Sequence, residues 1–216
     1  MKHIVCLISG RGSNLEAILR TARDEGWDVA ANARVAAVVS NCTQAPGLAI
    51  ARGFGVPTHV IEHGRFASRE AFDAALVETI DAYAPALVVL AGFMRVLTAG
   101  FVGHYEGRLI NVHPSLLPMF PGLATHRKAL AAGVRVHGAT VHFVSNDVDA
   151  GAIIAQAVVA VRPDDTEEAL AARVLAQEHR LLPRCARWVV EGRVRLVRGR
   201  AVVDGVDPAE LALFAR

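Results

Sequence analysis

The chain has 216 residues, of which 53% are hydrophobic, and it carries 23 Lys and Arg residues against 21 Asp and Glu residues. This length and apolar content exclude a disordered chain and predict a single globular domain with a sizeable core. The net charge of +2 is small, and the scattered basic residues disfavour nucleic acid as the main ligand.

Cysteine spacing and apolar run length indicate the compartment. Cys6, Cys42 and Cys185 lie too far apart for a zinc site and match no disulfide framework, which favours the reducing cytoplasm. No apolar run is long enough to span a bilayer, so we expect no membrane partner. The short apolar run at the N-terminus ends in Gly-Arg-Gly, which favours a first strand over a signal peptide.

Strand-like and helical segments alternate in the first half of the chain. The apolar runs predict strands at 3–9, 34–40, 86–92 and 108–113. The segments between them predict helices near 13–25, 45–54, 67–83 and 97–104, with Ser68 opening the third. This alternation indicates an α/β fold with a mainly parallel, Rossmann-like open twisted sheet and helices on both faces.

The second half of the chain predicts a different pairing. The strand-like runs 136–144 and 151–161 are separated by too few residues for a crossover helix, so they should pair antiparallel. A long helix should follow from about Thr166, which is placed to cap it. The arginine-rich segment 193–200 predicts a hairpin arm with Gly199 at its turn, followed by a short tail.

The segment "SGRGSN" at 9–14 is the first candidate for binding. Gly10 and Gly12 lie in the turn after the first strand, and Ser13 and Asn14 lie at the start of the following helix. Backbone N–H groups and the helix dipole at such a position favour an anion such as phosphate. The spacing departs from the known nucleotide-binding glycine patterns. A tight turn with Ser13 as the N-cap is the alternative.

The segment "INVHPSLLP" at 110–118 is the candidate for catalysis. Asn111 and His113 are two residues apart on a strand, so their side chains share one face, and they lie at the carboxyl end where ligands gather in parallel sheets. Pro114 and Pro118 restrict the backbone that follows. A structural role for a single histidine here is the alternative, but a polar pair favours chemistry.

Two further acidic positions could belong to a site. In the loop "SNDVDAG" at 145–151, Asp147 and Asp149 need be no more than turn residues, but a carboxylate near His113 would favour its protonated ring. Glu178 falls on the apolar stripe of the long helix, so it needs either a polar partner or a ligand such as ribose hydroxyls.

Histidine spacing gives no support for a metal site. The closest pairs are His59 with His63 and His137 with His142, and the second pair should point to opposite faces of its strand. No H-E-x-x-H motif or cysteine cluster accompanies them.

Together, "LISGRGSNLEAIL", "SREAFD", "VVLAGFMRVL", "INVHPSLLP", "GATVHFV", "VDAG" and "QEH" resemble the phosphoribosylglycinamide formyltransferase family. The resemblance is collinear from Ile4 to about Gly192. Several of these motifs are shared with other enzymes that use formyltetrahydrofolate. The GSN at the first helix marks the glycinamide ribonucleotide branch.

The resemblance implies transfer of a formyl group from the co-substrate 10-formyltetrahydrofolate to the amine of 5′-phosphoribosylglycinamide in purine synthesis, without a metal. It implies a catalytic trio of Asn111, His113 and Asp149. It implies substrate contacts from Gly12, Ser13, Asn14 and Glu178, and folate contacts from Arg69, Met94, Arg95, Val96, Leu97, Asn111, Val144, Ser145 and Asp149.

The family pattern also suggests an organisation for the domain 1–216. Residues 1–113 would form the phosphate or nucleotide-binding half, 114–192 the folate and catalytic half, and 193–216 the hairpin arm and tail. The protein would be a monomer or a homodimer. Leu175 and Ala124 replace polar residues expected at those positions, which affects fine substrate contacts but not the trio.

Three alternatives remain open at this point. A formyltetrahydrofolate hydrolase would carry an extra N-terminal regulatory domain, and a formyltransferase acting on methionyl-tRNA an extra C-terminal one, for which this length leaves no space. A formyltransferase acting on an amino sugar is a further relative. A non-catalytic module that binds a phosphate ligand would not need Asn111 and His113.

Overall fold

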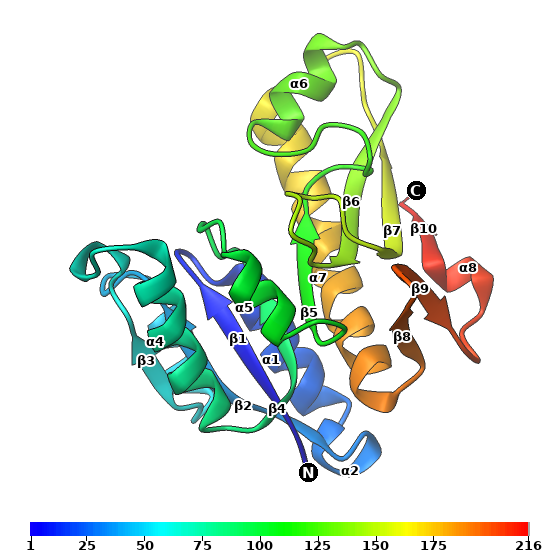
Figure 1. Ribbon diagram of the computed structural model, residues 1–216. Helices are drawn as coiled ribbons and strands as arrows, with labels where there is room; N and C mark the ends of the chain where they lie inside the picture. The colour runs from blue at the N-terminus through cyan, green and yellow to red at the C-terminus, as the bar shows by residue number, and fades with distance from the viewer. Residues whose placement is uncertain (216) are drawn as a thin grey trace.

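The computed structural model describes residues 1–215, and its N-terminal half is built on five parallel strands (Figure 1). These are β1 (Lys2–Ile8), β2 (Ala33–Ser40), β3 (Thr58–Val60), β4 (Pro85–Leu90) and β5 (Leu109–His113). They pair in the order β5-β4-β1-β2-β3. The predicted parallel sheet is confirmed, although the short edge strand β3 was not predicted.

Helices cover both faces of these strands because the strands are apolar on both sides. Ile4, Cys6 and Ile8 of β1 join one core cluster, whereas Val5 and Leu7 join the other. In Figure 1, α4 and α5 lie on one side of the strands and α1 and α7 on the other. The helices of this half are α1 (Ser13–Asp24), α2 (Trp27–Ala30), α3 (Gly47–Gly53), α4 (Arg69–Asp81) and α5 (Ala99–His104), with a 3₁₀ turn at His63–Arg65.

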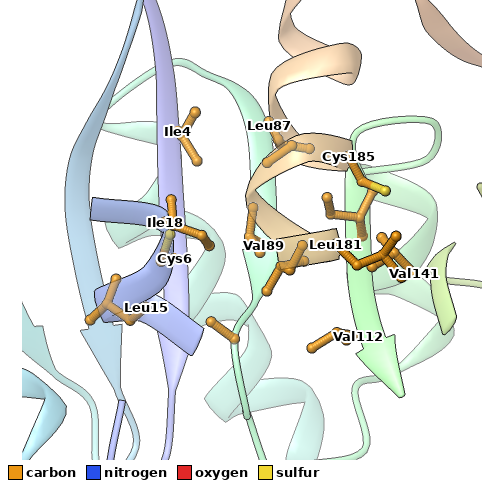
Figure 2. Close-up of a cluster of buried hydrophobic side chains, with 14 of the residues drawn as sticks. Ile4, Cys6, Leu15, Ile18, Leu87, Val89, Val112, Val141, Leu181 and Cys185 are labelled. Carbon is orange, nitrogen blue, oxygen red and sulfur yellow. The ribbon is translucent and has the colours of Figure 1, made fainter. Parts of the chain in front are cut away.

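The larger core cluster joins the two halves of the molecule. Figure 2 shows Ile18 of α1 beside Cys6 of β1, and Leu181 and Cys185 of α7 beside Val141 of β6. Burial raises the pKa of the Cys6 thiol to about 12, so this cysteine acts as a small core hydrophobe.

Strand direction reverses in the C-terminal half. β6 (Val136–Phe143) pairs antiparallel with β5, and β7 (Ile153–Ala160) pairs antiparallel with β6, as predicted for the latter pair. The short helix α6 (Thr125–Ala131) precedes β6. The long helix α7 (Glu167–Glu191) begins after Thr166, whose side chain accepts a hydrogen bond from the Ala169 N–H, confirming the predicted cap.

The C-terminal segment returns to the main sheet. The predicted arm is the hairpin of β8 (Val194–Val197) and β9 (Arg200–Val203), with Gly199 in its turn. The segment predicted as a short tail contains a helix and a strand of the main sheet. After α8 (Pro208–Leu211), the strand β10 (Ala212–Phe214) pairs parallel with β7. Among residues 1–215, no helix combines the length and apolarity required to cross a membrane.

Candidate active site

The end of β5 presents Asn111 and His113 on one face of the sheet. Val112 points to the opposite face, where it joins the core cluster (Figure 2). This alternation follows from the two-residue period of a strand. The predicted polar pair therefore lies at the carboxyl end of a strand and on a shared face.

His113 is held between two oxygen acceptors. Its side chain is buried, with 5% of the residue exposed. Nε2 lies 3.0 Å from the Phe120 carbonyl oxygen, which can only accept a hydrogen bond, so Nε2 carries a proton. Nδ1 lies 3.2 Å from Oδ2 of Asp149. Both ring nitrogens thus face oxygen acceptors, which fix the orientation of the ring.

Asp149 reaches His113 from the loop that joins β6 and β7. Its Oδ2 also accepts a hydrogen bond of 2.8 Å from the Gly122 N–H, so the carboxylate links this loop to the segment after β5. The Asp149 backbone has a φ of +54°, in the left-handed region. The loop leaves β6 beside Leu109, where the Val144 N–H donates to the Leu109 carbonyl, and then folds back towards His113.

His142 is a site residue that the sequence analysis missed. It lies opposite Asn111 in the antiparallel pairing of β5 and β6. Its Nδ1 donates to the Phe143 carbonyl at 2.9 Å, which leaves Nε2 free to accept from the Asn111 side-chain amide at 3.3 Å. Burial lowers the pKa of His142, which favours this neutral form. The alternation of side chains along β6 predicts which residues share a face with His142. Only the register between β6 and β5 shows that His142 lies opposite Asn111.

These residues border a cavity of about 590 Å³. Asn111, His113, His142 and Asp149 lie in its lining. The stretch after β4 and the β6–β7 loop contribute the predicted folate residues Met94, Arg95, Val96, Leu97, Val144 and Ser145. The remaining predicted folate residue, Arg69, is exposed at the start of α4 and is not part of the lining.

A second group of predicted residues lies where α1 meets α7. Gly12 is the N-cap of α1, with a φ of 77°, and Ser13 is the first helical residue, so the alternative of Ser13 as N-cap is wrong. A Cβ at Gly12 would lie 2.5 Å from the Gly47 Cα, which requires glycine at this position. Asn14 donates a hydrogen bond of 2.7 Å from Nδ2 to Oε2 of Glu178.

Glu178 therefore has Asn14 as a hydrogen-bond partner within the protein, and both side chains are buried. Burial raises the pKa of Glu178, and this effect is opposed by the Asn14 hydrogen bond and by the Arg11 charge. The amide oxygen of Asn14 is buried without a hydrogen-bond partner. Within residues 1–215, no group of three or more His, Cys, Asp or Glu side chains has the arrangement of a metal site.

Comparison with known proteins places this geometry in a family. Residues 2–186 match the family model described as "Formyl transferase". The chain is 48% identical over 206 residues to a phosphoribosylglycinamide formyltransferase of Escherichia coli, covering 94% of each chain. The structure of a phosphoribosylglycinamide formyltransferase from Coxiella burnetii is 44% identical, with a TM-score of 0.90, and the alignment covers 100% of this chain and 99% of that one.

A formyltetrahydrofolate deformylase from Pseudomonas syringae is a more distant match. It is 27% identical with a TM-score of 0.85, and the alignment covers 94% of this chain but only 66% of the deformylase. The chain thus shares its fold with an enzyme named for a different reaction. Its sequence identity and its coverage are higher for the phosphoribosylglycinamide formyltransferases. The chain belongs to the phosphoribosylglycinamide formyltransferase family.

Proposed function

We propose that the chain transfers the formyl group of 10-formyltetrahydrofolate to the primary amine of 5′-phosphoribosylglycinamide, with Asn111, His113 and Asp149 as its catalytic residues. The observation that carries the proposal is the contact of 3.2 Å between His113 Nδ1 and Asp149 Oδ2, beside Asn111 in the lining of a cavity large enough for a folate. Membership of the family supplies the reaction.

The side chains have complementary roles in this reaction. When the amine attacks the formyl carbon, negative charge develops on the formyl oxygen, and the second N–H of the Asn111 amide, which His142 does not use, can donate a hydrogen bond to it. The two nitrogens of His113 face Phe120 and Asp149, so His113 would have to leave one of these acceptors to donate to the same oxygen. Asp149 holds the His113 ring in place by accepting a hydrogen bond from its Nδ1. Asp149 can also help to move, through water, the proton that the attacking amine loses to the folate nitrogen whose bond to the formyl carbon breaks.

The remaining parts of the two substrates have separate binding groups. The folate would lie against Met94, Arg95, Val96 and Leu97 on one side and Val144 and Ser145 on the other. The phosphate of the ribonucleotide would bind the N–H groups of Gly12, Ser13 and Asn14 at the start of α1, where the helix dipole favours an anion. Glu178 would accept hydrogen bonds from the ribose hydroxyls while Asn14 holds its other oxygen.

The catalytic assignment is tested by His113→Ala and Asp149→Asn. His113→Ala removes the ring of this contact and Asp149→Asn removes the negative charge of its carboxylate, so we expect kcat to fall about 10²- to 10⁴-fold, the range of general acid–base effects. Formation of the formylated ribonucleotide from purified components is the measurement.

A second histidine–aspartate pair provides the matched control. His104 Nε2 lies 2.7 Å from Asp81 Oδ2 at the surface, away from the cavity lining. His104→Ala and Asp81→Asn should leave kcat within twofold of the unmodified protein. Equal losses from both pairs would contradict the assignment of His113 and Asp149.

The ribose contact is tested separately by Glu178→Gln. This change keeps the volume of the side chain but removes the negative charge, so hydrogen bonds to ribose hydroxyls weaken. We expect KM for the ribonucleotide to rise about tenfold, which corresponds to the loss of roughly one charge-assisted hydrogen bond. KM for the folate should stay within twofold, and a rise in both KM values would argue against a ribose contact.

Formyltetrahydrofolate hydrolysis is the second candidate, favoured by the structural match to the deformylase. The two reactions differ in their acceptor, which is water for the hydrolase and an amine for the transferase. Release of tetrahydrofolate should therefore depend on added ribonucleotide. Release at the same rate without it would identify the hydrolase, and tight ribonucleotide binding without turnover would identify a binding module.

A further inference from the structure

The folate-facing stretch after β4 is held only in part by the core, in which Phe93 is buried and against which Leu97 packs. Between Gly92 and Thr98 it contains the exposed apolar residues Met94 and Val96, 65% and 57% exposed. Apolar side chains that face the cavity contribute no burial that would hold the backbone in place. The exposed part of the stretch therefore depends also on hydrogen bonds to its backbone groups.

Side chains of neighbouring elements supply two of these bonds. At one end, the Met94 N–H donates to Ser9 Oγ at 2.7 Å, and Ser9 follows β1. At the other end, the Thr98 N–H donates to Oδ2 of the buried Asp73 on α4 at 2.7 Å. In Figure 1 the green loop that leads into α5 lies beyond the arrowhead of β1.

Ser9 is itself held by a chain of polar side chains from two further strand ends. Since Ser9 Oγ accepts from Met94, its single proton is available for Asn41 Oδ1, which lies 2.6 Å away. The Asn41 amide in turn lies 3.2 Å from Nδ1 of His63. Asn41 is buried, and it follows β2 directly, while His63 lies after β3.

We infer that Ser9, Asn41 and His63 are positioning residues for folate, because their hydrogen-bond chain fixes the Met94 backbone against β1. The inference rests on the proposed function, in which Met94–Leu97 forms one wall of the folate site. None of the three residues lies in the lining of the large cavity, so they act through Met94 and not by contact.

The test is a split between the two KM values. Ser9→Ala removes the hydroxyl that accepts from Met94, so we expect KM for 10-formyltetrahydrofolate to rise about five- to tenfold, the effect of one lost hydrogen bond. KM for the ribonucleotide and kcat should stay within twofold. Hydrogen exchange at the Met94 amide should become faster in the protein without ligands. Ser9→Thr, which keeps a hydroxyl, should restore most of the folate affinity.

Two other variants keep the test informative. His63→Phe retains the aromatic contact with Phe72 but removes the acceptor for Asn41, so a smaller rise in the folate KM, about threefold, is expected. Ser40→Ala is the matched control, because Ser40 is also a buried hydroxyl at a strand end, but its bonds go to Cys42. It should leave the folate KM unchanged.

The outcomes separate this inference from the proposed function. Unmodified protein that transfers no formyl group would refute the proposed function. Active protein in which Ser9→Ala leaves the folate KM and the Met94 exchange unchanged would overturn the positioning role. A rise in both KM values in Ser9→Ala and Ser40→Ala alike would also overturn it, since that result indicates general destabilisation.

Discussion

Asn111 and His113 depend on partners that arrive from different parts of the chain. The Asn111 amide reaches His142 on β6, and His113 lies between the Phe120 carbonyl and Asp149. Each partner fixes the direction in which a hydrogen-bond donor points. Fixed donors raise reaction rates because they do not have to reorganise as charge develops.

His142→Phe tests the contribution of this orientation. The ring volume is kept, but the acceptor for the Asn111 amide is lost, so Asn111 can turn away from the formyl oxygen. We expect kcat to fall about tenfold, equivalent to roughly one hydrogen bond, with little change in either KM. Steady-state kinetics with both substrates is the measurement. An unchanged kcat would show that Asn111 is oriented without His142.

The sequence predicts those site residues that lie together on one strand or in one loop. Asn111 and His113 were predicted from strand alternation, and the role of Asp149 came from the family resemblance. His142 was missed because its importance depends on the register between β5 and β6. Register is set by the packing of whole strands, so a short motif does not contain it.

At the scale of elements, the β6–β7 loop depends on a close backbone approach at its base. A Cβ at Gly151 would lie 1.7 Å from the Phe143 carbonyl oxygen. The backbone beside Gly151 also joins the ends of β6 and β7, since the Phe143 N–H donates to the Ala152 carbonyl. The path of this loop, and with it the place of Asp149, therefore requires glycine at position 151.

Gly151→Ala should displace the loop and separate Asp149 from His113. We expect kcat to fall at least tenfold and the free energy of unfolding to fall by about 2 kcal/mol, because the added Cβ would overlap the Phe143 carbonyl. Urea unfolding and the transfer assay measure both effects. Gly103→Ala in α5 is the control, since no atom lies within 4 Å of its added Cβ. It should have no effect or stabilise the helix slightly.

The C-terminal strand illustrates a limit of element prediction. Residues 212–214 are too few to show a periodic pattern, so the sequence analysis described only a tail after the hairpin. The strand forms because β7 offers an unpaired edge beside it. Such pairing is decided by the rest of the sheet and not by local propensity.

At the scale of the whole molecule, the alternating strands and helices gave the parallel half of the sheet from sequence alone. The hairpin spacing gave the antiparallel pair β6–β7. The reversal between β5 and β6 was not predicted, because a long connection through α6 permits either direction.

Buried histidines should make the folded state sensitive to acid. Burial lowers the pKa values of His126, His137 and His142, that of His137 to about 4. The unfolded chain binds protons at these groups near pH 6.5, so between about pH 6.5 and 4 it holds more protons than the folded chain. The free energy of unfolding should therefore fall as the pH falls through this window, by up to roughly 3 kcal/mol from His137.

Urea unfolding at intervals from pH 7 to 4.5 measures this dependence. His137→Phe removes the titrating ring while keeping an aromatic side chain against Phe120, so the pH dependence should become less steep. A variant with the same steepness as the unmodified protein would show that other groups control the acid response.

The left-handed backbone at Asp149 restricts which amino acids can replace it. Asparagine and aspartate adopt a positive φ more readily than other residues with a side chain, whereas a longer acid such as glutamate does so at a cost of about 1 kcal/mol or more. Asp149→Asn thus changes the charge alone, but Asp149→Glu changes the loop as well. Of the residues that adopt this backbone readily, only aspartate supplies a carboxylate to His113.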